Sequence, residues 1–243
     1  MEKYRWRDIR WRDFSLVPII IVTFIGTLIY IVLNKAIFEE ALLIENFTLI
    51  GIDEINVLTQ LFTYILVITA FLCLNIDLFK TWMRQWWNGL KRYWLWIICA
   101  YIVTFGVAWA YGWVKDLFPN IYTTETTQNE QVINQLLSIP ELTLYNFLLI
   151  VFAGPIVEEI FFRHILIGEL GKKLNFIVMS IVSIVLFSTM HLIEISNWIE
   201  IIDYLIIAIP LVFLYIKSGR NLGVAISFHI LNNFIAYCIN MLN

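Results

Sequence analysis

Three short segments of this sequence place ionisable side chains within apolar surroundings. In the first, Glu158 and Glu159 lie side by side, and Arg163 follows Glu159 by four residues. Adjacent residues on a helix point about 100° apart, so the two glutamates are not expected to face one site. A spacing of four with the acid first favours an ion pair between Glu159 and Arg163. Glu158 is then the carboxylate that remains free to act as a base.

The other two segments each hold a histidine. His191 follows Phe187 by four residues, and Asn233 follows His229 by four, so each pair shares one face of a helix. A single membrane histidine or asparagine is more often a hydrogen-bond partner between helices, and a Glu–Arg pair is more often structural. The convergence of a base, two imidazoles and an amide favours a functional site, because each ionisable group inside a membrane costs about 2.5–3.5 kcal/mol.

The composition of the chain indicates a membrane protein. Of its residues 60% are hydrophobic and only 14% are charged, whereas a soluble domain has about 25% charged residues. The net charge is -3, and the sequence shows no basic stripe of the kind that meets phosphates, which argues against binding to nucleic acid. The three cysteines lie inside apolar runs and are interpreted as small buried hydrophobic residues.

The apolar runs predict an all-α, polytopic membrane bundle of about seven transmembrane helices. The run that begins at Leu142 is the fourth, and it continues through Glu158 and Glu159 to about Leu170. The sixth begins at Tyr204, and it reaches a spanning length only when the residues from Ile201 are included. A polar loop, Lys115–Glu141, contains an amphipathic stretch, Asn129–Leu137, that predicts a short interfacial helix. The predicted spans are Phe14–Asn34, Ile55–Ile76, Tyr93–Val114, Leu142–Val157, Leu174–Ile193, Tyr204–Ile216 and Asn221–Asn243.

The distribution of charge predicts the orientation. Of the 16 Lys and Arg residues, 13 fall in the N-terminal segment or in alternate loops, and these are assigned to the cytoplasm. Arg163 lies within the fourth run, shortly before the loop that holds Lys172 and Lys173, and only Lys35 and Lys115 fall on the other side. The N-terminus is therefore expected inside and the C-terminus outside, in a multi-pass protein of the cell membrane. Tryptophans gather near both predicted boundaries and are interpreted as interfacial anchors.

Taken together, Glu158-Glu159-x-x-Phe162-Arg163, Phe187-x-x-x-His191 and His229-x-x-x-Asn233 resemble the three motifs of the CAAX protease and bacteriocin-processing family, also called the Abi or CPBP family. The type II CAAX prenyl endopeptidases are its best-known members. The resemblance covers residues 154–233. It implies an intramembrane endopeptidase whose catalytic core is residues 142–243, preceded by residues 1–141 with the basic segment, three helices and the outer loop.

The resemblance also implies roles for four side chains. Glu158 would be the general base, and His191 would hold the attacking water. His229 and Asn233 would donate hydrogen bonds to the developing oxyanion, a contribution of about 3–4 kcal/mol for each well-placed donor.

Further residues are expected around these four. The resemblance implies that Glu159 and Arg163 fix the orientation of the helix face. It also implies that Phe162 and Phe187 pack the cavity. His164, next to Arg163, is expected near the cytoplasmic edge as an interfacial residue outside the site.

The cofactor is left open by the sequence. Glu158, His191 and His229 match a zinc set of two histidines and one glutamate with water as the fourth ligand. The chain has no His-Glu-x-x-His segment, however, so a zinc-free mechanism stands beside the zinc one.

The expected substrate is a small peptide precursor or a membrane-associated protein within the lipid bilayer. Two other functions stay open. One is a non-catalytic membrane partner of a sensor kinase or a peptide-immunity protein. The other is a transporter with a proton relay, although matching inverted repeats are not visible.

Overall fold

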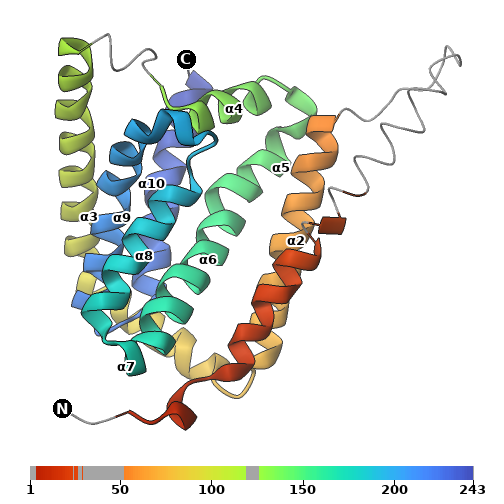
Figure 1. Cartoon of the computed structure of the whole chain (residues 1–243), viewed down its shortest axis with the longest axis vertical. Coiled ribbons are helices and arrows are strands. Elements are labelled where there is room, and N and C mark those ends of the chain that lie inside the picture. Colours follow the sequence, from red (N-terminus) through yellow and green to blue (C-terminus); the bar gives the residue numbers. More distant parts are fainter. Residues whose placement is uncertain (1–3, 24, 27–28, 30–51, 119–125, 243) are drawn as a thin grey trace, which may run out of the picture.

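The computed structural model describes residues 4–23, 25–26, 29, 52–118 and 126–242, and within these ranges every regular element is helical. The helices form an upright bundle, with the N-terminal segment at one end and the C-terminus at the other (Figure 1). Their bounds are α2 (Ile52–Leu74), α3 (Phe79–Leu117), α4 (Gln128–Leu137), α5 (Thr143–Phe147), α6 (Gly154–Glu159), α7 (Gly171–Leu174), α8 (Phe176–Met190), α9 (Ile201–Lys217) and α10 (Leu222–Leu242).

Five helices in the described residues are long and apolar enough to cross a membrane, which indicates a multi-pass integral membrane protein. They confirm the second, third, fourth, sixth and seventh predicted spans. Residues 16–23 of the first predicted span are helical, but most of the remainder of that span lies outside the described residues. The expected orientation stays a prediction. The five segments are Ile55–Leu74, Phe79–Leu117, Pro140–Leu174, Ser196–Lys217 and Leu222–Leu242.

The fifth predicted span, Leu174–Ile193, is wrong in length. The helix α8 has 15 residues, or about 22 Å, and a hydrocarbon core is about 30 Å thick. It ends at Met190, and His191 is its C-terminal cap. The ring Nδ1 of His191 lies 2.7 Å from the carbonyl oxygen of Phe187, so the side chain satisfies a carbonyl at the end of the helix. His191 therefore lies at a helix end rather than within a span.

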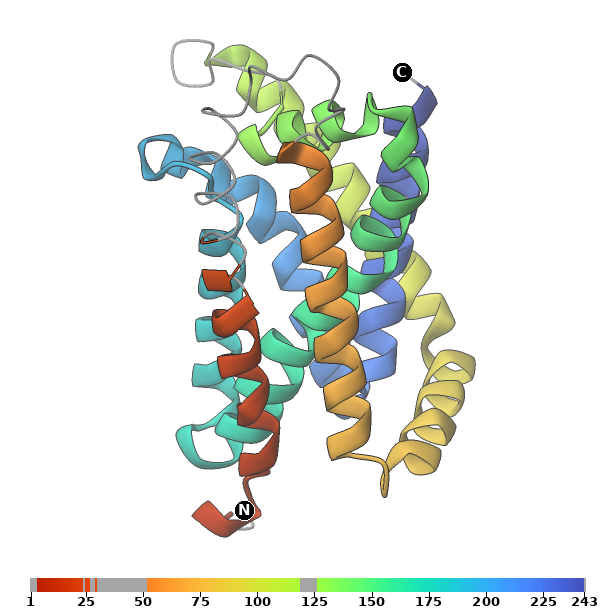
Figure 2. The same ribbon diagram turned by 90° about the vertical axis from the view of Figure 1, so that its right-hand side faces the viewer.

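The fourth predicted span does continue through its charged residues, as expected. It runs as one apolar helical segment from Pro140 to Leu174. Two π-helical stretches, η4 (Leu148–Ala153) and η5 (Ile160–Leu170), flank the short α6. The view in Figure 2 shows α2 running beside this segment, and α2 packs on both η4 and α6. Wide turns of this kind often occur at functional sites, because they change the direction of the side chains that follow.

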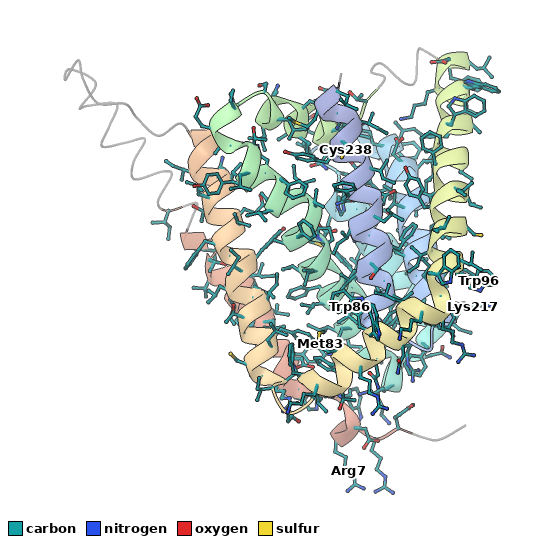
Figure 3. All side chains as sticks on the ribbon, turned by 180° about the vertical axis from the view of Figure 1, so that it is seen from behind. Arg7, Met83, Trp86, Trp96, Lys217 and Cys238 are labelled. Atoms are coloured by element: carbon teal, nitrogen blue, oxygen red, sulfur yellow. The ribbon has the colours of Figure 1, made fainter. Side chains whose placement is uncertain are left out.

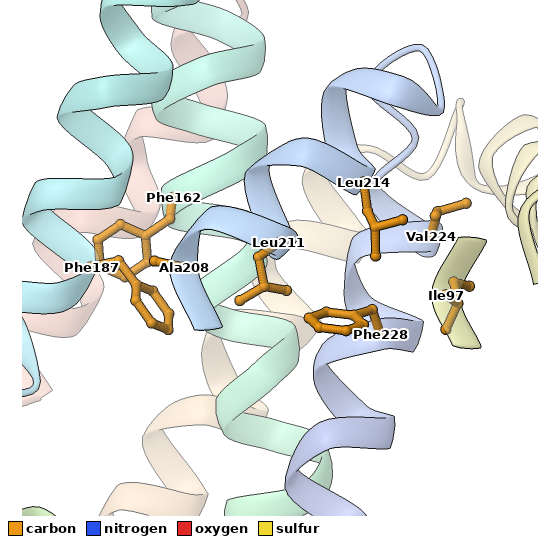
Figure 4. Packing of buried hydrophobic residues seen from close by; sticks show 8 residues of the cluster. All are labelled: Ile97, Phe162, Phe187, Ala208, Leu211, Leu214, Val224 and Phe228. Atoms are coloured by element: carbon orange, nitrogen blue, oxygen red, sulfur yellow. The ribbon is translucent and has the colours of Figure 1, made fainter. Parts of the chain in front are cut away.

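The apolar core joins α3, η5, α8, α9 and α10 (Figure 4). The rings of Phe162 and Phe187 meet edge to face, with their centroids 5.2 Å apart. Both rings are buried, and the cavity-packing role that the resemblance implies for them stays a prediction. The other buried members of this cluster are Ile97, Ala208, Leu211, Leu214, Val224 and Phe228.

The short helix predicted in the outer loop is also present. Its structure runs from Gln128 to Leu137, and the side chain of Thr127 accepts a hydrogen bond from the backbone N–H of Glu130 at its start. The carboxylate of Glu200, which directly precedes α9, accepts from the backbone N–H of Gln128. These contacts attach the start of α4 to the start of α9.

The N-terminal segment is attached to the helical stretch η5 by a buried polar network. Asp13 is fully buried in η2 (Trp11–Ser15), and its carboxylate lies 2.8 Å from Nε2 of His164. The side-chain amide of Asn75 donates to the other oxygen of Asp13. The ring of His164 is also packed edge-on against Phe71 and Trp82. The expectation that His164 is an interfacial residue is therefore wrong, because it is buried and has an acidic partner.

We expect this network to contribute strongly to stability. Burial raises the pKa of Asp13, but hydrogen bonds from His164 and Asn75 outweigh that effect and hold its pKa below the ordinary value. The Asp13→Asn variant should lose about 3 kcal/mol at neutral pH, because breaking a buried pair leaves one partner uncompensated. Since the folded pKa is depressed, the contribution is complete above the ordinary carboxyl pKa and is lost as the pH falls below about 4.

The measurement is unfolding of the full chain in detergent, followed by tryptophan fluorescence at several pH values. The control is Asp77→Asn, which breaks the exposed pair with Arg12 and should cost less than about 1 kcal/mol. Equal losses in the two variants, or a difference between Asp13→Asn and wild type that persists undiminished at pH 3, would contradict the assignment.

Candidate active site

Glu158 lies between the two histidines that the sequence singled out. Its Oε2 is 3.8 Å from Nε2 of His191 and 3.7 Å from Nε2 of His229. That oxygen is buried and accepts no hydrogen bond from the described residues. The side chains of Glu158 and His191 are each 23% exposed, so small molecules can approach them, while His229 is buried. The structure thus brings together side chains from α6, the end of α8 and the middle of α10.

The hydrogen bonds on the far side of each ring fix where its proton lies. The carbonyl of Phe187 can only accept, so Nδ1 of His191 carries a proton. Nδ1 of His229 lies 2.9 Å from a carboxylate oxygen of Glu159 and is protonated for the same reason. In the neutral rings both Nε2 atoms are therefore acceptors. They face the unpaired oxygen of Glu158, so the three acceptors surround a place that suits a hydrogen-bond donor.

Both neighbouring glutamates contact the same imidazole, which corrects the expectation that they could not face one site. Glu158 approaches Nε2 of His229, and Glu159 holds Nδ1. The two carboxylates do diverge as adjacent helical residues must, but the ring of His229 enters between them from α10 and presents one nitrogen to each. The sequence around Glu158 and Glu159 cannot predict this arrangement, because it depends on a side chain from another helix.

The predicted ion pair between Glu159 and Arg163 is present. The distance from Nε of Arg163 to Oε2 of Glu159 is 3.1 Å, and both side chains are fully buried. The guanidinium also lies over the ring of Phe187, 4.8 Å from its centroid. Arg163 thus compensates the charge of Glu159, which in turn orients His229.

Asn233 shares its helix with His229, but its contacts are elsewhere. One N–H of its amide donates to the backbone carbonyl of Ile150 at 3.0 Å, in the π-helical stretch η4. Its side-chain oxygen accepts from Asn232. Since an amide has two N–H groups, the second one is available for another acceptor. The role implied for Asn233 stays a prediction.

The metal hypothesis stays a prediction. Among the described residues, no group of three or more His, Cys, Asp or Glu side chains meets the geometry of a metal site. The three side chains of the expected zinc set do come together, because Oε2 of Glu158 lies 3.8 Å from Nε2 of His191 and 3.7 Å from Nε2 of His229.

Two tyrosines near the site were not found from the sequence. The ring of Tyr204 in α9 lies 5.0 Å from the ring of His191, and its hydroxyl donates to Thr127, just before α4. Tyr64 in α2 lies close enough to Glu158 to interact with its charge. Both come from helices outside the three motifs, and an isolated tyrosine in an apolar run carries no spacing signal that could have marked it.

Comparison with protein-family models gives one match. Residues 140–235 match the family described as "Type II CAAX prenyl endopeptidase Rce1-like". The matched region runs from the start of the fourth span to Ile235 in α10, and it contains all three motifs. Neither the comparison with curated proteins nor the comparison with solved structures found a significant match.

A double-mutant cycle tests whether Glu159 and Arg163 stabilise each other. We expect Arg163→Met alone to cost about 3–5 kcal/mol of unfolding free energy, because it leaves a buried carboxylate unpaired. Adding Glu159→Gln should recover a large part of that loss, with a coupling energy of about 0.5–3 kcal/mol. The measurement is thermal or denaturant unfolding in detergent. Strictly additive losses would show that the two side chains do not depend on each other.

Proposed function

Because residues 140–235 match the Rce1-like family of type II CAAX prenyl endopeptidases, we propose that this chain is an intramembrane endopeptidase that hydrolyses a peptide bond with a water activated by Glu158 and His191. The observation that carries the proposal is the unpaired, partly accessible carboxylate of Glu158 facing two imidazole nitrogens. A base with no hydrogen-bond donor of its own, beside two oriented acceptors, suits the binding of water.

The first step follows from these positions. A water donates one hydrogen bond to Oε2 of Glu158 and the other to Nε2 of His191, which leaves its lone pair free for the scissile carbonyl carbon. As the new C–O bond forms, Glu158 takes the proton and the carbonyl oxygen becomes an oxyanion. Positioned acid–base catalysis of this kind contributes a factor of about 10²–10⁴.

His229 can stabilise the oxyanion only when Nε2 also carries a proton. The carboxylate of Glu159 at Nδ1 holds the ring with Nε2 directed at the site, so the buried Glu159–Arg163 pair would act on the reaction through the position of His229. The second N–H of Asn233 would supply another donor. In the last step Glu158 returns its proton to the leaving amine, and the C–N bond breaks.

The proposed substrate is a small peptide precursor or the tail of a membrane-associated protein. A site built in a helical membrane bundle favours substrates that lie in or near the bilayer. We assign residues 142–243 as the catalytic core and the cell membrane as the location, with the N-terminus in the cytoplasm.

The decisive variants are Glu158→Gln and His191→Ala. We expect each to lower cleavage about 100-fold or more while the protein still folds and reaches the membrane, because each removes a group that holds the water. Peptide profiling of cells with wild-type or variant protein reports activity and substrate together. The control is Glu141→Gln, an exposed glutamate outside the site, which should process normally.

Normal processing in both site variants would contradict the proposal. It would instead favour the non-catalytic membrane partner, whose action depends on its surfaces rather than on the carboxylate.

Metal removal gives a separate test. Because Glu158 and His191 can hold the attacking water by hydrogen bonds alone, we expect purified protein to retain its cleavage after dialysis against a chelator. Loss of cleavage that added Zn²⁺ restores, together with bound zinc in the wild type that Glu158→Gln lacks, would overturn the metal-free mechanism.

A further inference from the structure

The helix α3 is far longer than a membrane crossing requires. Its 39 residues span about 58 Å, and the hydrocarbon core of a bilayer is about 30 Å thick. The charge-free stretch 93–114 is long enough to cross, so residues 79–92 extend beyond it. In Figure 3 this first part runs obliquely past Met83 and Trp86, and the helix then turns along the bundle near Trp96. It lies at the same end as Arg7 and Lys217.

One face of residues 79–92 is fixed to the bundle. Nε1 of Trp86 donates to the hydroxyl of Ser227, and the side chain of Asn221 donates to the carbonyl of Gln85. A Cβ at Gly223 would overlap the ring of Trp86, so only a glycine in α10 allows this approach. Trp86 is therefore a packing residue and not the interfacial anchor expected from the sequence. The segment is held rigidly across the start of α10.

The opposite face carries a row of exposed cations, which we call the α3 basic stripe: Lys80, Arg84 and Lys91. With Trp87 between them, the four residues follow a spacing of four, three and four, so they line one side of the helix. The ammonium of Lys91 lies 5.0 Å from the centre of a Trp87 ring. The sequence interpretation placed these residues in a loop, and only a continuous helix aligns them on one face.

Among the described residues, the acids at this end of the bundle all have partners other than the α3 basic stripe. Asp13 contacts His164 and Asn75, Asp77 contacts Arg12, and Glu169 contacts Lys172. Asp8 accepts from the backbone N–H of Arg5. The segment between Asp77 and Asp116 contains no acidic residue at all. The charge of the stripe is therefore available to an external anion.

We propose that the α3 basic stripe binds the phosphate groups of anionic phospholipids in the leaflet at this end of the bundle. The cations share the helix surface with exposed apolar side chains, among them Phe79, Met83 and Trp87. Such a mixture suits the boundary between headgroups and acyl chains, where tryptophan is enriched and Lys and Arg attract anionic lipid. The inference does not depend on the proposed endopeptidase activity.

The experiment measures phospholipid binding to the full chain purified in detergent. Phosphatidylglycerol is titrated, retained lipid is counted by native mass spectrometry, and the melting temperature is followed by tryptophan fluorescence. We expect wild type to bind and to be stabilised by this lipid, and the Lys80→Gln/Arg84→Gln/Lys91→Gln variant to bind on the order of 100-fold more weakly, from about fivefold for each cation.

The matched control is Arg5→Gln/Arg7→Gln/Lys217→Gln, which removes the same charge from exposed positions at the same end of the bundle. This control should bind like wild type, whereas phosphatidylcholine and inorganic phosphate should not stabilise any form. Equal weakening in the two triple variants, wild-type binding by the stripe variant, or equal stabilisation by phosphatidylcholine or by free phosphate would each overturn the proposal.

Discussion

The contact on which the site depends is the one between Glu159, Arg163 and His229. Glu159 and Arg163 are fully buried, and in a low-dielectric interior each charge persists only with a partner. The pair holds Glu159 in place, Glu159 holds Nδ1 of His229, and the protonated Nδ1 leaves Nε2 directed at Glu158. A buried ion pair thereby determines which nitrogen of His229 faces Glu158.

The same constraint explains how the neighbouring segments are attached. Polar groups among packed apolar helices must find partners within the protein. Asp13 meets His164 at one end of the bundle, while Tyr204 and Glu200 meet the residues that begin α4 at the other. The first contact fixes the N-terminal segment against the motif-bearing helix. The second links the start of α4 to Tyr204, whose ring lies 5.0 Å from that of His191. His164 and Tyr204 lie within residues 140–235, which match the family model, and each is bound to a segment that precedes those residues.

The protein also has to fit its surroundings at the membrane boundary. The long α3 combines a membrane-crossing half with a half that lies across the start of α10. The inner face of that second half is defined by Trp86 and Gly223, and its outer face by the α3 basic stripe. Since α10 also carries His229, one helix both supports the boundary segment of α3 and contributes a histidine to the proposed catalytic centre.

The sequence by itself determined the membrane class, the positions of five long helices, the Glu159–Arg163 pair and the family resemblance. These features depend on composition and on spacings of three to four residues, which a helix converts directly into geometry. Only the tertiary structure decided that both glutamates meet His229, that Asp13 pairs with His164, and that His191 ends its helix instead of lying within it. These contacts join residues far apart in the chain or depend on how a helix ends, and local periodicity contains no information about which helices become neighbours.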